Sequence, residues 1–301
     1  MAELNVNIGN LPLKNPVMTA SGTFGYGIEY ADFMDISRLG GIFVKGTTIQ
    51  PREGNDYPRM AETPSGMLNA VGLQNPGIDL FCERDIPFLK KYDTKIIVNV
   101  CGHAPEEYLA VVERLADEPI DMMEINISCP NVNAGFLAFG QDAKHVEELT
   151  AQIKKIAKQP IIMKLTPNVT DITEIAKAAE AGGADALSLI NTLTGMKIDI
   201  NRRTFAVANK TGGVSGPVVH PIAVRMVYQT AQAVNIPIIG MGGIATPEDA
   251  IEMILAGASA VSVGTANFYN PNATIEIIDG IEAYMKKNGF ESVKDMVGIV
   301  K

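Results

Sequence analysis

The sequence predicts an α/β protein built as a (β/α)8 TIM barrel, with a short N-terminal hairpin and long loops at the C-terminal face. Short, nearly continuous apolar runs alternate with segments of helical periodicity, which is typical of parallel strands covered by helices. Eight such runs occur within 301 residues. Eight units in a chain of this length fit a barrel better than an open sheet.

Each expected strand precedes a helical or loop segment. The strands are Pro16–Ala20, Gly41–Lys45, Lys95–Val100, Asp121–Ile127, Pro160–Leu165, Ala184–Ile190, Ile236–Gly240 and Ala258–Val263. The helices are Pro105–Ala116, Asp142–Lys158, Asp171–Ala181, Pro221–Val234, Pro247–Ala256 and Ala273–Lys287. Several of these helices begin with proline or acidic residues, which suit the unpaired N–H groups and positive end of a helix.

Segments outside this repeat predict a hairpin and two functional loops. Leu4–Ile8 and Leu11–Leu13, separated by a turn, are expected to pair ahead of the barrel. Gln50–Pro76 and Asn191–Pro221 each follow an expected strand and are too long for simple turns. Long loops at the C-terminal face of a barrel usually carry function. No linker divides the chain, so we expect residues 1–301 to form one domain.

Composition and charge exclude several functional classes. The chain carries 25 Lys and Arg against 34 Asp and Glu, a net charge of −9 that argues against nucleic acid as the main partner. There is no signal-peptide pattern and no apolar stretch of the roughly 18 residues that span a bilayer. The three cysteines, Cys82, Cys101 and Cys129, are too scattered for a disulfide framework or an iron–sulfur site. These features predict a reduced, cytoplasmic protein.

Polar residues at the strand ends predict a ligand site. Lys45, Asn99, Asn126 and Lys164 end four consecutive strands, and Asn191–Thr192 follow the next one. A lysine in an apolar strand is costly unless its charge has a partner, although one lysine alone can extend to the barrel rim. Two lysines and three amides on one rim predict a site for an anionic, planar, hydrogen-bonding ligand.

Glycines after the last two strands predict a phosphate site. Gly240–Ile244 and Gly264–Thr265 lie where barrels bind phosphate with main-chain N–H groups. Gly240, Gly242 and Ala245 also match a dinucleotide fingerprint, but no acid at a following strand end is present to hold a ribose. A mononucleotide phosphate is the better interpretation, and glycines that serve only tight turns are the alternative.

The stretch Met122–Asn131 combines a buried strand with a polar end. Asn126, Ser128 and Cys129 follow its apolar half. Free cysteines are usually small buried hydrophobes, but Cys129 follows a strand end and precedes Pro130. Because no histidine is close in sequence, proton transfer by the thiol fits better than nucleophilic catalysis.

These residues together resemble a known family, the class 1 dihydroorotate dehydrogenases, nearly from end to end. The resemblance is carried by Ala20–Gly25, Val44–Thr47, Asn69–Gly77, Asn126–Asn131 and Gly242–Ile244, which are specific in this order and spacing. It implies FMN at the barrel mouth with dihydroorotate stacked on it, and a role in pyrimidine (UMP) biosynthesis.

The resemblance also implies roles for individual residues. FMN would be held by Ser21, Lys45, Gly46, Asn99, Asn126, Lys164, Ile190, Gly216, Gly242, Gly243, Gly264 and Thr265. Substrate would be held by Lys45, Asn69, Ala70, Val71, Gly72, Leu73, Asn126, Asn191 and Thr192. Cys129 would be the base that removes the C5 proton while hydride leaves C6, and Lys164 would stabilise negative charge on the reduced flavin. No metal site is implied in this chain.

Within class 1, the Asn69–Gly77 loop is similar to the 1B type. That type passes electrons through a partner subunit with FAD and a [2Fe–2S] cluster to NAD⁺, which implies a homodimer at the core of a heterotetramer. The alternatives are the 1A type, a homodimer that uses fumarate, and a non-redox phosphate-binding barrel such as an isomerase or lyase. Flavin barrels that reduce uracil in tRNA fit an acidic chain poorly.

Overall fold

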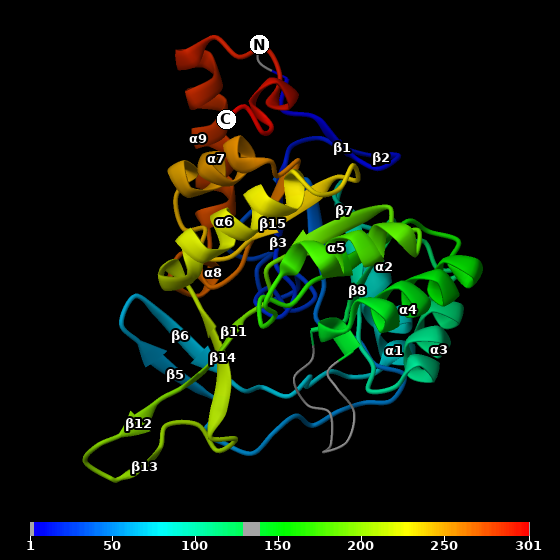
Figure 1. Cartoon of the computed structure of the whole chain (residues 1–301), viewed down its shortest axis with the longest axis vertical. Coiled ribbons are helices and arrows are strands. Elements are labelled where there is room, and N and C mark those ends of the chain that lie inside the picture. The colour runs from blue at the N-terminus through cyan, green and yellow to red at the C-terminus, as the bar shows by residue number, and fades with distance from the viewer. Residues whose placement is uncertain (1–2, 129–138, 301) are drawn as a thin grey trace.

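Eight parallel strands close into a barrel (Figure 1). The computed structural model describes residues 3–128 and 139–300. In barrel order the strands are β3 (Val17–Thr19), β4 (Gly41–Phe43), β7 (Lys95–Val100), β8 (Met122–Asn126), β9 (Ile161–Lys164), β10 (Ala186–Leu189), β15 (Ile238–Met241) and β16 (Ala260–Val263). β16 pairs back onto β3, so the barrel has no free edge. The predicted (β/α)8 fold is confirmed.

Helices surround the barrel. The main ones are α3 (Pro105–Leu115), α4 (Ala143–Ile156), α5 (Ile172–Ala181), α6 (His220–Ala231), α7 (Pro247–Ala256) and α9 (Ala273–Asn288). Successive helices contact one another round the ring, and α9 packs against β3 and α7. Several begin at a side-chain cap: Asp142 accepts from His145 N, and Thr246 with Asp249 forms a capping box.

Shorter helices complete the outer layer. They are α1 (Ile78–Leu80), the π-helical turn η2 (Phe81–Asp85), α2 (Ile86–Leu89), α8 (Ala266–Tyr269) and the 3-10 turns η1 (Ile36–Arg38), η3 (Phe139–Gln141), η4 (Pro217–Val219) and η5 (Val293–Met296). Among the described residues, no helix is long and apolar enough to cross a membrane.

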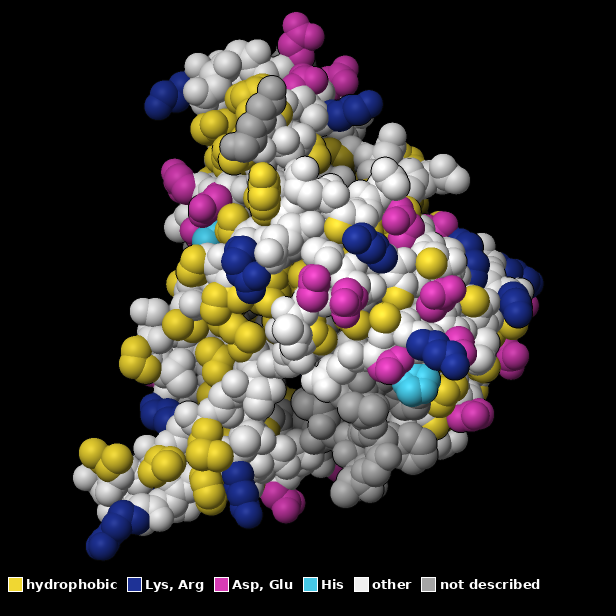
Figure 2. Space-filling view, viewed as in Figure 1, with side chains coloured by type: hydrophobic (Ala, Val, Ile, Leu, Met, Phe, Trp, Pro, Cys, Tyr) yellow, Lys and Arg dark blue, Asp and Glu magenta, His cyan; other side chains and the backbone are white. Residues whose placement is uncertain are grey.

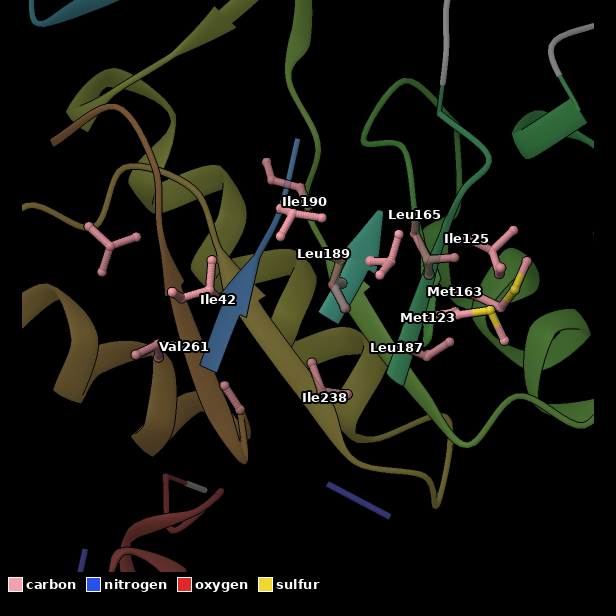
Figure 3. Close-up of a cluster of buried hydrophobic side chains, with 14 of the residues drawn as sticks. Ile42, Met123, Ile125, Met163, Leu165, Leu187, Leu189, Ile190, Ile238 and Val261 are labelled. Atoms are coloured by element: carbon pink, nitrogen blue, oxygen red, sulfur yellow. The ribbon is translucent and has the colours of Figure 1, made fainter. Parts of the chain in front are cut away.

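The core lies between the strands and the helices. Outward-facing strand residues such as Ile42, Met163 and Leu187 belong to one large cluster of buried apolar side chains. Figure 3 shows members of this cluster on neighbouring strands, with Met163 in β9 and Leu187 and Leu189 in β10. Because every other residue of a strand faces this layer, the residues between them face the barrel interior.

The predicted N-terminal hairpin is present as β1 (Val6–Ile8) and β2 (Leu11–Leu13). Its buried side chains Ile8 and Leu13 join a second apolar cluster with inward-facing strand residues, including Met18 and Phe43. The hairpin thereby closes the interior of the barrel with apolar side chains.

The two long connections differ from the expected loops because they pair with each other. The first contains β5 (Met60–Thr63) and β6 (Gly66–Asn69), and the second contains β11 (Leu193–Met196), β12 (Ile198–Asp199), β13 (Thr204–Phe205) and β14 (Thr211–Ser215). β11, β14, β6 and β5 form one antiparallel sheet, and β12 pairs with β13. Partners such as Asn69 and Gly213 lie far apart in sequence, so local patterns carry little sign of this pairing.

The β12–β13 hairpin extends from this sheet as an arm (Figure 1). Met196, Ile198, Ile200 and Phe205 on and beside the arm are exposed. Figure 2 shows hydrophobic side chains along the same part of the molecule.

Candidate active site

A cavity of about 270 Å³ opens at the carboxyl ends of the barrel strands. All eight barrel strands or the residues directly after them contribute to its wall, including Ser21, Lys45, Asn99, Asn126 and Lys164. The small antiparallel sheet supplies another wall through Met67, Asn69, Gly213 and Val214. The carboxyl ends of barrel strands are the usual position of active sites in this fold.

The barrel interior has two layers of opposite chemistry. The lower layer is apolar and consists of Met18, Phe43, Ile97, Met122, Ile162, Ala186, Ile239 and Ala260. The upper layer lies two residues further along each strand and consists of Ala20, Lys45, Asn99, Glu124, Lys164, Ser188, Met241 and Ser262. Because side chains alternate along a strand, both layers face inward. All upper-layer residues except Glu124 and Ser188 line the cavity.

Lys164 is held in the upper layer by polar contacts from other strands. Its Nζ donates to Ser21 Oγ at 3.2 Å and lies 3.8 Å from Glu124 Oε2. Glu124 is fully buried. The lysine is 4% exposed, so its charge lies inside the protein beside the cavity. A buried ammonium is tolerable because it has a carboxylate nearby.

Lys45 is the second cation in the cavity wall. Burial lowers the pKa of its side chain below the ordinary lysine value, the nearby Cys101 thiol acts in the opposite direction, and the charge of Lys164 lowers the pKa further. A lysine in this state gains from an anionic ligand, because the ligand places an opposite charge beside its ammonium.

Asn126 joins the strand end to two neighbouring segments. Its Oδ1 accepts from Ser128 Oγ at 2.6 Å and from Asn191 Nδ2 at 3.4 Å. Asn191 Nδ2 also donates to Ser128 Oγ, and Asn191 Oδ1 accepts from Thr192 N at 2.8 Å. Asn126, Ser128, Asn191 and Thr192 all line the cavity, so these predicted residues are brought together in one polar wall.

The end of β6 and the loop after it form another part of the cavity wall. Asn69, Val71, Gly72 and Leu73 line it. Ala70 was included in the same predicted group but does not line the cavity, because its side chain packs with Leu68 and Val207 in a small apolar cluster.

The glycine-rich end of the cavity is built from tight backbone turns. Gly216, Gly242 and Gly243 line it with positive φ angles of 93°, 126° and 72°. A side chain at Gly243 would also meet His220 Cβ at 2.7 Å. Gly264 and Thr265 lie beside them, and Thr265 Oγ1 donates to Ser215 Oγ at 2.8 Å. These turns bring main-chain groups close to the cavity, as a phosphate site requires.

The donor set of the cavity fits an anionic cofactor. Two lysines and several amides and hydroxyls line it, and no Asp or Glu is among its lining residues in the described part of the chain. Ser262 Oγ, in the wall, is buried and has no hydrogen-bond partner within residues 3–128 and 139–300. An unpartnered buried hydroxyl is costly, so a ligand group at this position would satisfy it.

Of the three remaining predicted residues, two line the cavity and one lies outside the described residues. Gly46 and Ile190 line the cavity. Cys129 lies outside the described residues. Within the part that is described, no group of three or more His, Cys, Asp or Glu residues is placed to hold a metal ion.

Comparisons with known proteins place the chain in a family. The family model for dihydroorotate dehydrogenase matches residues 3–285. The chain is 65% identical to a protein of Lachnoclostridium phytofermentans over 99% of both chains. It is 62% identical to one of Parabacteroides distasonis, over 99% of this chain and 98% of that one. It is 53% identical to one of Thermoanaerobacter pseudethanolicus, over 99% of both.

The chain belongs to the dihydroorotate dehydrogenase family. All three relatives are named dihydroorotate dehydrogenase B (NAD(+)), catalytic subunit. The resemblance to the class 1B catalytic subunits is therefore confirmed.

Glu124 was not among the site residues predicted from the sequence. Its signal was available, because it is the one acid in the apolar run Met122–Ile127 and lies two residues before Asn126 on the same face of β8. Ser188 and Ser262 were missed in the same way, since each is a small hydroxyl residue inside an apolar strand.

Proposed function

We propose that this chain is the FMN-containing catalytic subunit that oxidises (S)-dihydroorotate to orotate in de novo pyrimidine biosynthesis. The observation that carries the proposal is the cavity at the barrel mouth, with its two lysines and its wall of amides and hydroxyls. The relatives' names supply the reaction, and the cavity suits a substrate with a carboxylate and ring amides.

FMN would occupy the side of the cavity formed by the ends of β15, β16 and β3. Its phosphate would bind main-chain N–H groups near Gly216, Gly242, Gly243, Gly264 and Thr265. Its ring system would contact residues of the polar wall and one apolar side chain, which are Ser21, Lys45, Gly46, Asn99, Asn126, Lys164 and Ile190. Bound FMN supplies the acceptor for the hydride from C6 of the substrate.

The substrate would lie against the loop after β6 and the Asn126 wall. Lys45 would pair with its carboxylate, and Asn69, Asn126, Asn191 and Thr192 would bind its ring amides. Gly72 and Leu73 would let the backbone approach closely, since both have positive φ angles, of 77° and 58°. Val71 would pack on the ring, and Ala70 would act through the loop rather than by contact.

Two side chains would carry the chemistry. Cys129 is proposed as the base that takes the C5 proton, and Ser128, the residue before it, lines the cavity. Lys164 would stabilise the negative charge that develops on the flavin, because its ammonium is fixed before the reaction begins.

Electrons would leave through a partner subunit that carries FAD and a [2Fe–2S] cluster, with NAD⁺ as the final acceptor. The words "B (NAD(+)), catalytic subunit" in the relatives' names support this proposal. We further propose a single domain spanning residues 1–301, a homodimer at the core of a heterotetramer, and a cytoplasmic location.

The purified chain tests the proposal directly. With FMN bound and oxygen removed, dihydroorotate should bleach the flavin absorbance and yield orotate. NAD⁺ should be reduced only after the electron-transfer subunit is added. A chain that binds no flavin would overturn the redox assignment, and rapid turnover with fumarate alone would favour the 1A type.

The role of Cys129 is tested by Cys129→Ala with Cys82→Ala as the matched control. Cys82 is buried and does not line the cavity. Cys129→Ala should bind FMN but reduce it about 10²–10⁴-fold more slowly, the usual effect of losing a general base. Cys82→Ala should retain the normal rate. Normal reduction by Cys129→Ala would remove the thiol from the mechanism.

A further inference from the structure

The barrel interior contains a buried carboxylate that the proposed reaction does not use. Glu124 lies in the upper layer, in the centre of β8, and is 0% exposed. The lower layer is built from apolar side chains only. Burying a charged group costs several kcal/mol, and an ion pair does not usually recover more than an apolar replacement would. The fold itself therefore does not require an acid at this position.

Two other strands direct hydrogen-bond donors at this carboxylate, and a third places an ammonium near it. Ser188 Oγ of β10 donates to Oε1 at 2.6 Å, and Asn99 Nδ2 of β7 donates to Oε2. Lys164 of β9 places its ammonium 3.8 Å from Oε2. These contacts fix Glu124 directly behind two cavity-lining residues, Asn99 and Lys164.

The contact with Lys164 is electrostatic and leaves the ammonium hydrogens available. A separation of 3.8 Å is longer than an N–H···O hydrogen bond. Lys164 instead donates to Ser21 Oγ at 3.2 Å. The carboxylate therefore draws the ammonium toward the upper layer without consuming its donors.

Lys45 and Lys164 supply two positive charges to the cavity wall, and Glu124 supplies one negative charge behind it. Two positive charges less one negative charge leave one net positive charge beside the ligand. Charges in a buried site act with little screening, so a change of one charge alters the stability of an anionic ligand.

We propose that Glu124 is a positioning residue that holds the Lys164 ammonium in place and, by cancelling one of the two lysine charges, sets the reduction potential of the bound flavin. This inference rests on the proposed function, because it requires FMN in the cavity. Glu124 does not touch the flavin: it positions the Lys164 ammonium, and its own negative charge lies behind the cavity wall.

The proposal predicts that the flavin potential follows the charge beside it. Glu124→Gln keeps the size of the side chain and removes its charge, so reduced flavin, which is the more negative form, is favoured. We expect about a tenfold higher ratio of reduced to oxidised flavin at a fixed potential, which is about 30 mV for a two-electron couple. Lys164→Met should shift the potential in the opposite direction. Lys164→Met/Glu124→Gln should lie between the two single variants.

The experiment measures the midpoint potential of FMN in the purified protein against a reference dye, at one fixed pH for all variants. Ser188→Ala is the matched control, because it removes a hydrogen bond to Glu124 without changing the charge. The midpoint potential of Ser188→Ala should equal that of the wild type. For Glu124→Asp, which retains the charge, the ratio of reduced to oxidised flavin at a fixed potential should remain within a few-fold of the wild-type ratio.

Each outcome decides the proposal. Midpoint potentials that rise from Lys164→Met through the double variant to Glu124→Gln support the proposal. Equal potentials or another order overturn it. If Glu124→Gln alone does not fold, the comparison of Lys164→Met with the double variant remains, since adding Glu124→Gln must raise the potential. A wild-type chain that lacks flavin or is not reduced by dihydroorotate would instead refute the proposed function.

Discussion

The lower and upper layers of the barrel interior use the same eight strands for different purposes. The lower layer is an apolar cluster closed by Ile8 and Leu13 of the N-terminal hairpin. The upper layer, two residues further along each strand, contains two lysines, a buried glutamate, an asparagine and two serines. A step of two residues keeps the direction of a side chain, so the sequence changes the chemistry of the interior without changing the backbone.

Stability and reactivity are therefore assigned to different layers along the barrel axis. Apolar burial in the lower layer stabilises the fold. The upper layer instead contains groups that are costly to bury, such as the Lys45 ammonium, whose pKa is lowered mainly by burial. Functional sites often retain such costs because a ligand offsets them.

The largest expected effect is on stability and comes from the lower layer. Ile239→Ala should lower the free energy of unfolding by about 2–5 kcal/mol, because it leaves a cavity among closely packed side chains. Ile239 is fully buried in this cluster. Urea unfolding measures the loss, while the folded variant should still reduce its flavin with dihydroorotate. Unchanged stability would contradict the role assigned to the lower layer.

The second expected effect comes from the upper layer and is a loss of activity without a loss of stability. Lys45→Met should slow flavin reduction by about 10²–10³-fold, the scale of losing one fixed electrostatic contact. The free energy of unfolding should not fall, because the change removes a charge that burial disfavours. Single-turnover kinetics and urea unfolding on the same sample measure both quantities. A loss of stability like that of Ile239→Ala would make Lys45 a structural residue.

The third effect is a pH dependence of ligand affinity. The pKa of Lys45 is lowered in the folded protein, so its positive charge is lost at a lower pH than that of a free lysine. The charged form costs stability below the folded pKa, and this cost disappears as pH rises through the unfolded value. The affinity for an anion changes with pH in the opposite direction: it falls as pH rises, because binding requires the charged lysine.

Orotate affinity should therefore fall by up to about tenfold per pH unit above the folded pKa of Lys45. Flavin absorbance during orotate titrations between about pH 7 and about pH 10 measures this change. Lys45→Arg is the control, since arginine stays charged throughout and any remaining slope belongs to other groups. Equal slopes in the two proteins would show that Lys45 does not control the affinity.

Much of the fold could be predicted from the sequence because its signals are local. The eight apolar runs, the helix starts and the N-terminal hairpin each depend on a few consecutive residues. The sheet that joins β6 to β14 could not, since Asn69 pairs with Gly213, which lies 144 residues further along the chain. Gly212 and Gly213 look like turn residues, yet a side chain at Gly212 would clash with the backbone of Asn69 in β6, and one at Gly213 would clash with Thr192.

The cavity wall was predictable for a related reason. Strand ends meet at one face of a barrel, so Lys45, Asn126 and Lys164 had to lie together. The side chain of Ala70 lies outside the cavity wall, in the small apolar cluster with Leu68 and Val207, and this packing could not be read from the motif. Glu124 was overlooked because an acid inside an apolar run gives no indication of its partners until the barrel brings Asn99, Lys164 and Ser188 around it.

We propose that the polar upper layer binds the flavin and the substrate. A crystal structure of the purified chain with FMN and orotate tests this claim most directly. We expect the FMN phosphate at Gly242, Gly243, Gly264 and Thr265, its ring beside Lys164, and the orotate carboxylate on Lys45. Flavin or orotate bound elsewhere, with Lys45 and Lys164 touching neither, would contradict it.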